Sequence, residues 1–357
     1  MPTPSSPPPA DHDAAPPVAD PRLDLLTDWL NALPAALGLQ VGSIRRASDD
    51  ASFRRYFRID CAGGPHASLI AMDAPPPLED CRPFVHAAQV FAQAGMTVPG
   101  VIASDLERGF LLLTDFGTTT YLDVIDAGNA PVLYAEASQA LVRIQRASRP
   151  GVFPDYDRAV LLRELMLFPE WYVERHKGVT LDDAARRTLT DAFELLIANN
   201  LAQPQVFVHR DYHTRNLMLL PGDANPGVLD FQDALLGPIT YDLVSLLRDA
   251  YVAWDEEQVL DWAIRHWERA RKAGLPVAAD FSEFYRDFEW MGLQRHLKVL
   301  GIFARLNHRD GKSRYLADMP RVLRYVTAAV ARYNAFGPLA ALIERIEGDA
   351  RTVGYTF

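Results

Sequence analysis

Three oxygen-bearing side chains stand at a spacing that could transfer a phosphoryl group. Asp211 and Asn216 are separated by four residues in HRDYHTRN, and Asp230 follows fourteen residues after Asn216, at the end of an apolar run. If the apolar runs between them pair as a hairpin, Asn216 and Asp230 reach the same end, where an amide and a carboxylate suit Mg²⁺. Asp211 would lie one strand end away, free to accept a proton from a substrate hydroxyl. Phosphoryl transfer uses this division of labour.

The elements that must position these residues are short strands in an otherwise helical region. VFVH precedes the motif, and LMLL and GVLDF follow it, so polar groups cluster at strand ends, where chemistry often sits. From about residue 119 onward the apolar residues otherwise recur at helical spacing. We expect helices near residues 158–175, 183–199, 241–252, 255–272, 281–306 and 319–347.

The N-terminal part has a different pattern. RLDLLTDWLNALPAALG predicts an opening helix, and ASFRRYFRID and ASLIAMDAP predict two strands around the turn CAGGPH. A helix in FVHAAQVFAQAG and two strand-like runs in VIASDLERGFLLLTDFG follow. We therefore expect an α+β protein of two lobes. A small sheet-rich N-terminal lobe spans 21–115, a larger, mainly helical C-terminal lobe spans 116–357, and the proline-rich segment 1–20 is a disordered tail.

Composition excludes several classes of function. The 357 residues hold 36 Lys and Arg against 46 Asp and Glu, a net charge of −10, so bulk attraction to nucleic acid is not expected. No apolar run reaches the roughly 18 residues that cross a bilayer, and residues 1–20 carry no Lys, Arg or apolar core of a secretory signal. With only Cys61 and Cys81, a reducing cytoplasm is the default location, and we expect a monomer.

The motifs resemble a known family. HRDYHTRN followed by LDF resembles the kinase catalytic loop, and His213 makes it similar to the H-x-D-x-H-x-x-N of aminoglycoside phosphotransferase-like kinases. Over residues 45–335 the chain resembles bacterial cell-wall sugar kinases, which phosphorylate the anomeric hydroxyl of N-acetylmuramate and N-acetylglucosamine in peptidoglycan recycling. The blocks that carry this resemblance are ASFRRYFRI, IAMDAPP, ELMLFPEWYVERH, GVLDFQDALLGPITYDLVSLLRDAY and LQRHLKVLGIFARL.

The resemblance implies a protein-kinase-like fold, ATP and Mg²⁺ as cofactors, and an amino sugar as the small-molecule substrate. It makes Asp211 the catalytic base and Asn216 and Asp230 the metal ligands. The segment LLLTDFGTT would be the hinge, with Asp115 near the nucleotide; its DFG precedes the catalytic loop and is not the metal-binding one.

The small lobe departs from the usual kinase pattern. It has no glycine-rich loop and no lysine, because the first lysine of the chain is Lys177. The phosphates still need a cation, and Arg54, Arg55 and Arg58 are the local candidates, of which we favour Arg55. Alternation places Arg55 on one face with Phe53 and Phe57. Small polar residues of the loop 48–52, including Ser52, would offer backbone N–H groups beside Phe53.

Substrate contacts are harder to assign. Arg210 is a loop or substrate contact, and His209 could contact the sugar but is expected to brace the catalytic loop. Asp233 could bind sugar hydroxyls or metal, or form a cap or ion pair. Arg295, with Lys298 and Arg305 at helical spacing, forms either a solvated helix face or a basic stripe for the lactyl carboxylate of N-acetylmuramate.

Three other functions stay open at this point. The chain could be a kinase of the same superfamily acting on an amino alcohol, a ketoamine or an aminoglycoside. It could be a nucleotide-binding pseudokinase, because the lysine is missing. It could also be a metallohydrolase, whose ligands would be drawn from His209, Asp211, His213, Asp230 and Asp233.

Overall fold

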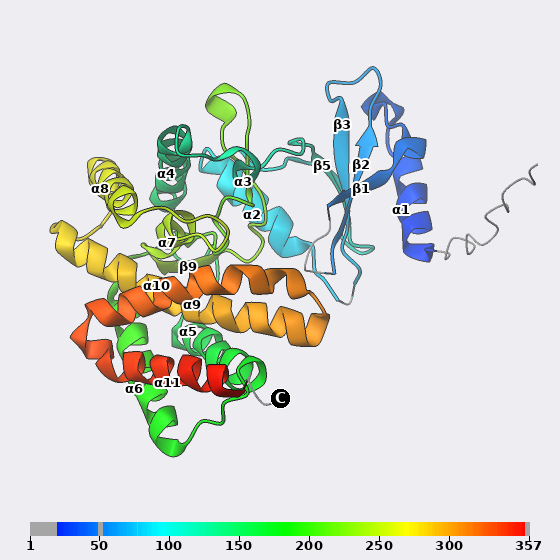
Figure 1. Cartoon of the computed structure of the whole chain (residues 1–357). Helices are drawn as coiled ribbons and strands as arrows, with labels where there is room; N and C mark the ends of the chain where they lie inside the picture. The colour runs from blue at the N-terminus through cyan, green and yellow to red at the C-terminus, as the bar shows by residue number, and fades with distance from the viewer. Residues whose placement is uncertain (1–19, 49–52, 77, 354–357) are drawn as a thin grey trace, which may run out of the picture. The chain divides into compact units, whose positions relative to one another are not determined.

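The computed structural model describes residues 20–48, 53–76 and 78–353 (Figure 1). By their contacts, the residues divide into a smaller unit, Met1–Cys81 with Ile102–Asp115, and a larger unit, Arg82–Val101 with Phe116–Phe357. Residues 82–101 thus group with the larger unit, although the sequence placed them in the lobe 21–115. The expected tail lies outside the described residues except for Asp20.

The smaller unit is built on an antiparallel sheet. Its strands, in spatial order, are β1 (Arg45–Ser48), β2 (Arg55–Asp60), β3 (Ser68–Asp73), β5 (Phe110–Thr114) and β4 (Val101–Asp105). Strands β2 and β3 pair in register from Arg55 opposite Asp73 to Asp60 opposite Ser68, so the hairpin predicted around CAGGPH is confirmed.

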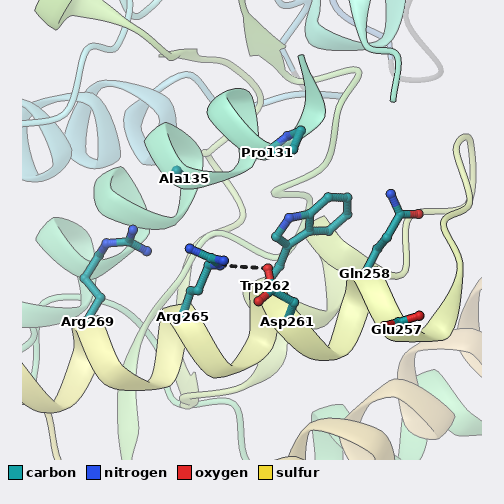
Figure 2. A pocket seen from close by; sticks show the side chains of 8 residues that line it. All are labelled: Pro131, Ala135, Glu257, Gln258, Asp261, Trp262, Arg265 and Arg269. Atoms are coloured by element: carbon teal, nitrogen blue, oxygen red, sulfur yellow. Dashed lines mark hydrogen bonds and ion pairs between the residues drawn. The ribbon is translucent and has the colours of Figure 1, made fainter. Parts of the chain in front are cut away.

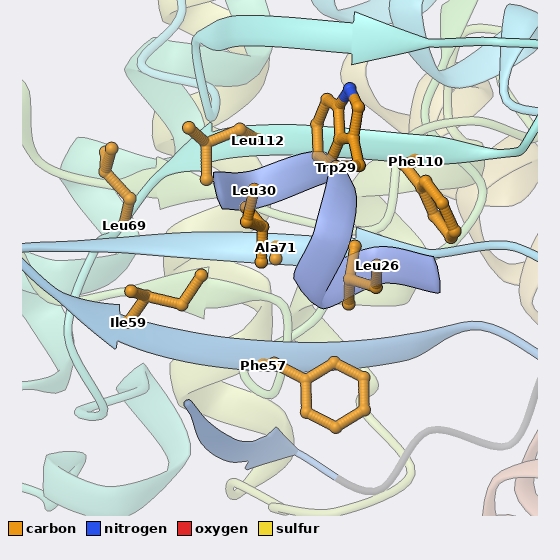
Figure 3. Close-up of a cluster of buried hydrophobic side chains, with 9 residues drawn as sticks. All are labelled: Leu26, Trp29, Leu30, Phe57, Ile59, Leu69, Ala71, Phe110 and Leu112. Atoms are coloured by element: carbon orange, nitrogen blue, oxygen red, sulfur yellow. The ribbon is translucent and has the colours of Figure 1, made fainter. Parts of the chain in front are cut away.

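One helix covers one face of this sheet. α1 (Pro21–Asn31) begins at Asp20, whose side chain caps it by accepting a hydrogen bond from the Leu23 N–H at 3.1 Å. Figure 3 shows the packed cluster that α1 and the sheet form: Leu26, Trp29, Leu30, Phe57, Ile59, Leu69, Ala71, Phe110 and Leu112. Because side chains alternate along β2, Arg55 shares this face with Phe57, and Tyr56 and Arg58 lie on the other.

The larger unit is mainly helical. Its longer α-helices are α2 (Arg82–Gln93), α4 (Ala130–Arg146), α5 (Arg158–Leu165), α6 (Asp183–Ala202), α7 (Tyr241–Leu247), α8 (Glu256–Lys272), α9 (Phe281–Asp310), α10 (Met319–Arg332) and α11 (Gly337–Val353). The short helix α3 (Tyr121–Val124) and the π-helix η3 (Phe168–His176) also belong to this unit. α9 is the central element: it packs against η3, α6, α7 and α10, and α10 runs beside it (Figure 1).

Two predicted helices are divided in the structure. The range 158–175 contains α5 and then η3, which begins beside Pro169, a residue with no N–H to donate. The range 319–347 is divided between α10 and α11 by a 3₁₀ turn at Asn334–Phe336. The helix predicted over 241–252 ends earlier, at Leu247.

Two small antiparallel strand pairs interrupt the helices. β6 (Gln205–Val208) pairs with β9 (Leu235–Pro238), and β7 (Leu217–Met218) pairs with β8 (Gly227–Val228). β9 was not predicted, because LLGP is short and combines glycine and proline, which are depleted in strands.

Among the described residues, no single helix is both long enough and apolar enough to cross a membrane. Ser313–Arg332 and Asn334–Gly348 reach that length and apolarity only as a pair, and they are bent by 113° at the break between them.

Candidate active site

The predicted hairpin brings Asn216 and Asp230 together. Leu217 pairs with Val228, and the Leu229 N–H donates to the Asn216 carbonyl at 2.9 Å. The Asn216 side-chain amide donates to Asp230 Oδ2 at 3.4 Å and to the Asp211 carbonyl at 2.9 Å. Asp211, Asn216 and Asp230 therefore form one constellation within the larger unit.

The backbone is strained at two residues of this constellation. Arg210 has a φ of 79° and Asp230 a φ of 64°, in the left-handed region that non-glycine residues rarely adopt. Each such residue costs about 1–3 kcal/mol and persists where the surroundings hold it, often at functional sites. The two strained residues lie just after strand ends: Arg210, which precedes Asp211, follows β6, and Asp230 follows β8.

Asp242, at the start of α7, holds the first part of the loop 209–216, which carries Asp211 and Asn216. Its carboxylate accepts the His209 N–H at 2.6 Å and the Arg210 N–H at 2.9 Å. Burial raises the pKa of Asp242 to about 7, against the lowering effect of these two donors. The hydrogen-bond partners of Asp242 are thus backbone amides of the loop.

Two further side chains fix the rest of the loop. The Tyr212 hydroxyl donates to the Ala137 carbonyl on α4 at 2.8 Å. Asp249 accepts both the N–H and the hydroxyl of Thr214, at 3.0 and 2.5 Å. The loop is thus tied to α4 and to the segment after α7 by buried hydrogen bonds.

His209 braces the loop from inside. It is fully buried; its Nε2 contacts the Leu229 carbonyl at 2.9 Å, and its Nδ1 accepts the Asp211 N–H at 3.3 Å. Burial lowers the pKa of His209 to about 4, so the ring is neutral. These contacts fit the bracing role that the sequence favoured, and they leave neither ring nitrogen directed at a substrate.

Glu164 on α5 gathers the charges beside the loop. It forms ion pairs with Arg210 and with Lys298, whose Nζ lies at 3.0 Å, and it accepts the Tyr156 hydroxyl. Lys298 also donates to the Tyr241 hydroxyl at 3.0 Å. Burial would raise the pKa of Glu164, but Lys298 and Arg210 hold it below its ordinary value. Arg210 is therefore engaged within the protein.

The surroundings of Asp211 are electropositive. Burial alone would raise the pKa of Asp211, but the positive charges of Lys298, Arg295 and Arg210 outweigh it and keep the pKa below its ordinary value. Asp211 is accordingly a carboxylate at neutral pH, as a proton acceptor must be.

Asp230 and its neighbours fit a magnesium site. Gln232 Nε2 donates to Asp230 Oδ1 at 2.8 Å, which orients the carboxylate, and Asp233 is exposed. One carboxylate and one amide match the few protein ligands that Mg²⁺ takes when phosphates and water supply the rest. Among the described residues, no three His, Cys, Asp or Glu side chains are arranged to hold a metal, so the metallohydrolase cluster is not assembled.

In the smaller unit, Arg55 is bound on the α1 face. Its guanidinium forms ion pairs with Asp20, the helix cap, and with Asp73, which is fully buried and also binds Arg22. The Arg55 Nε to Asp73 Oδ2 distance is 2.9 Å. Arg55 therefore joins α1 to the sheet, which leaves its role as the phosphate cation a prediction without structural support.

The other residues that the sequence placed near the nucleotide are Asp115, Arg54, Arg58 and Phe53. Asp115 accepts Arg58 Nε at 2.5 Å and the Ser68 hydroxyl at 2.7 Å. Arg54 forms a 3.1 Å ion pair with Glu79, close to Phe53, whose side chain is 63% exposed. Ser52 lies outside the described residues.

Sequence reasoning did not identify Glu164 as a site residue, and it did not identify Asp73 as the partner of Arg22 and Arg55. Both are acids within apolar segments, which is the signal that could have identified them, because a buried carboxylate needs a cation. Their partners are distant in sequence, from Arg22 to Asp73 and from Glu164 to Lys298.

The larger unit also has an open hollow of about 460 Å³ apart from this constellation. Trp262, Arg265 and Arg269 project from α8 toward Pro131 and Ala135 of α4, and Arg265 is paired with Asp261 at 2.7 Å (Figure 2). No residue of the catalytic loop lines it.

Comparison with known proteins assigns the chain to a family. The model of the phosphotransferase enzyme family matches residues 43–280. An N-acetylmuramate/N-acetylglucosamine kinase of Pseudomonas putida is 49% identical over 94% of this chain and 99% of its own length. A protein of the same name from Pseudomonas aeruginosa is 50% identical over 93% and 98%.

A solved structure bears on the fold. A choline/ethanolamine kinase family protein from Mesorhizobium loti aligns with a TM-score of 0.59 at 16% identity, covering 90% of this chain and 99% of its own. The expected α+β fold, with an antiparallel sheet in the smaller unit and a mainly helical larger unit, is confirmed.

Proposed function

Because this chain belongs to the phosphotransferase enzyme family, we propose that it is an ATP- and Mg²⁺-dependent kinase of N-acetylmuramate and N-acetylglucosamine, forming the sugar 1-phosphate. The observation that carries the proposal is the constellation of Asp211, Asn216 and Asp230 on one loop and one hairpin. The names of two relatives about half identical over nearly the whole chain support the two sugars as substrates.

The residues divide the work of phosphoryl transfer. Asn216 and Asp230 would hold Mg²⁺, which, with ATP bound, neutralises the charge of the phosphates. Asp211 accepts a hydrogen bond from the anomeric hydroxyl, orients its oxygen, and takes the proton as the new bond forms. Its lowered pKa keeps it ionised, and its main contribution is to position the hydroxyl, because the acceptor proton leaves late in a loose transition state.

The phosphate cation is the part that we assign differently from the sequence prediction. Arg55 is held on the α1 face by Asp20 and Asp73, whereas Arg58 alternates onto the opposite face of β2 and Arg54 directly precedes the strand. We therefore move the proposal to Arg54 or Arg58, either of which would exchange part of its carboxylate contact for a phosphate.

ADP release tests the function directly. Purified protein with MgATP is assayed without acceptor and with N-acetylmuramate, N-acetylglucosamine or an aminoglycoside, and the product is identified by phosphorus NMR. We expect turnover with both amino sugars and a phosphate on the anomeric carbon. Turnover with the aminoglycoside alone, or a phosphate on another oxygen, would contradict the proposal.

Replacement of the base tests the assignment of Asp211. Asp211→Asn keeps the shape but cannot accept the proton, so we expect turnover to fall by about 10²–10⁴. Nucleotide binding, measured by calorimetry with a non-hydrolysable ATP analogue, should persist. Unchanged turnover would assign the proton to another group, and loss of nucleotide binding would point to a damaged fold.

The same proposal includes the setting of the reaction. We expect a monomer in the cytoplasm that recycles peptidoglycan sugars. Light scattering of the purified protein tests the oligomeric state, and accumulation of the unphosphorylated sugars in cells lacking the protein tests the recycling role.

A further inference from the structure

Among the residues that the structure describes, Arg295 on α9 is a buried cation without a hydrogen-bond partner. Its side chain is 3% exposed, and its Nη1 makes no hydrogen bond. Within the described part of the chain it has no ion pair either. A buried guanidinium is costly unless it is paired and hydrogen-bonded, so an unpaired one beside a reaction centre indicates an anion that arrives with a ligand.

Its neighbours place Arg295 on the acceptor side of the site. The charge of Arg295 acts on Asp211, the proposed proton acceptor, and on its neighbours His213 and Asp242. His213 Nδ1 is a second buried nitrogen without a hydrogen bond. Two neighbouring side chains therefore each have a free nitrogen position beside Asp211.

The other cations of this region are already paired. Lys298, one helical turn further along α9, is bound to Glu164 and Tyr241, and Arg210 is bound to Glu164. Arg295 is neither on a solvated helix face nor part of a stripe of equivalent charges. Of the three cations Arg210, Arg295 and Lys298, Arg295 is the one that can bind an anion of a ligand.

The two sugars in the names of the relatives differ by one anion. N-acetylmuramate is N-acetylglucosamine with a lactyl ether on its ring, and the lactyl group ends in a carboxylate. We propose that Arg295, with His213 beside it, binds this carboxylate and thereby favours N-acetylmuramate over N-acetylglucosamine. The inference rests on the proposed function. A guanidinium suits a carboxylate because it can donate two parallel hydrogen bonds.

The transferred phosphoryl group is the alternative anion. The metal side of the constellation is expected at Asp230, which contacts Asn216 and Gln232. The charge of Arg295 acts on His213 and on Asp211, to which the proposed function assigns the acceptor hydroxyl.

The test compares three acceptors that differ only at this group: N-acetylmuramate, its carboxamide, and N-acetylglucosamine. We expect the wild-type protein to prefer the acid over the amide by about 10–100-fold in kcat/KM, the value of one charge-assisted contact. In Arg295→Met this ratio should fall to near one, chiefly through KM; the ratio is the readout because loss of the Arg295 charge acts on Asp211 equally for all three acceptors. Arg295→Lys should restore part of the preference.

A matched control is available on the same helix. Arg305 also has a buried Nε without a hydrogen bond, but the charges that act on it are those of Arg309 and Asp310, away from Asp211. Arg305→Met should leave the acid-to-amide ratio unchanged.

Each contrary result is distinct. An equal fall in kcat for all three acceptors in Arg295→Met, with the acid-to-amide ratio unchanged, would assign Arg295 to Asp211 or to the phosphoryl group. A wild-type protein that does not distinguish acid from amide would overturn the inference without any variant. If the wild-type protein phosphorylates neither sugar, the proposed function fails and the inference with it.

Discussion

The ionisable side chain of Asp242 supports the shape of the catalytic loop. Its two oxygens accept the N–H groups of His209 and Arg210, the residues directly before Asp211. In Asp242→Asn one of these donors faces an amide N–H₂ and loses its acceptor. We expect a loss of about 1–3 kcal/mol in the free energy of unfolding, together with lower turnover, because Asp211 loses its support. Stability and turnover equal to wild type would contradict this role.

The pH dependence of stability gives a second readout of the same residue. The pKa of Asp242 is about 7 in the folded protein and about 3.9 when unfolded, so between these values the native state retains a proton that the unfolded state has lost. The contribution of Asp242 to stability is therefore present at low pH and falls, by at most about 1.4 kcal/mol per pH unit, until pH 7. Urea unfolding from pH 5 to 8 should show this fall in wild type but not in Asp242→Asn. Parallel curves would contradict it.

At the scale of elements, one glycine sets how closely α9 approaches the start of η3. A Cβ on Gly301 would lie 2.4 Å from the backbone carbonyl of Leu167, a distance that no rotamer change can relieve. Gly301→Ala must push these elements apart, and we expect a cost of at least about 1–3 kcal/mol, seen as a lower Tm in thermal unfolding.

Gly292 on the same helix provides the control. A Cβ there would meet Val244 and His296 at 3.6 to 3.9 Å, ordinary contact distances. Gly292→Ala should leave Tm unchanged or raise it slightly, because alanine favours the helix over glycine by about 1 kcal/mol. An equal loss in both variants would show that the contact with Leu167 is not the cause.

The elements near the site were predictable to the extent that their contacts are local. Asn216 and Asp230 meet through the short pair of β7 and β8, and the apolar runs in the sequence indicate both strands. Alternation placed Arg55 with Phe57 correctly. It could not indicate which face of the sheet α1 covers, because that depends on contacts between residues far apart in sequence, such as Arg55 with Asp20, 35 positions apart, and Arg22 with Asp73, 51 positions apart. For the same reason, the partnership of Glu164 with Lys298 was not visible in the sequence.

At the scale of the whole molecule, ligand binding should raise the free energy of unfolding and therefore Tm. A ligand that binds only the folded protein stabilises it, by about 2.7 kcal/mol at one hundred times its Kd. We expect MgADP to raise Tm more than ADP with EDTA does. Asp230→Asn should remove that magnesium-dependent difference, since it removes the carboxylate of the proposed metal pair. Retention of the full difference would assign the metal to other residues.

The distribution of lysine has a practical consequence for chemical probes. The chain has four lysines, Lys177, Lys272, Lys298 and Lys312, and all of them belong to the larger unit. Glu164 keeps the pKa of Lys298 above its ordinary value despite burial, so that amine is protonated. Nucleotide reagents that acylate the phosphate-binding lysine of other kinases would find no lysine in the smaller unit. Profiling based on such reagents would overlook this protein, whereas guanidinium-directed groups could distinguish it from lysine-bearing kinases.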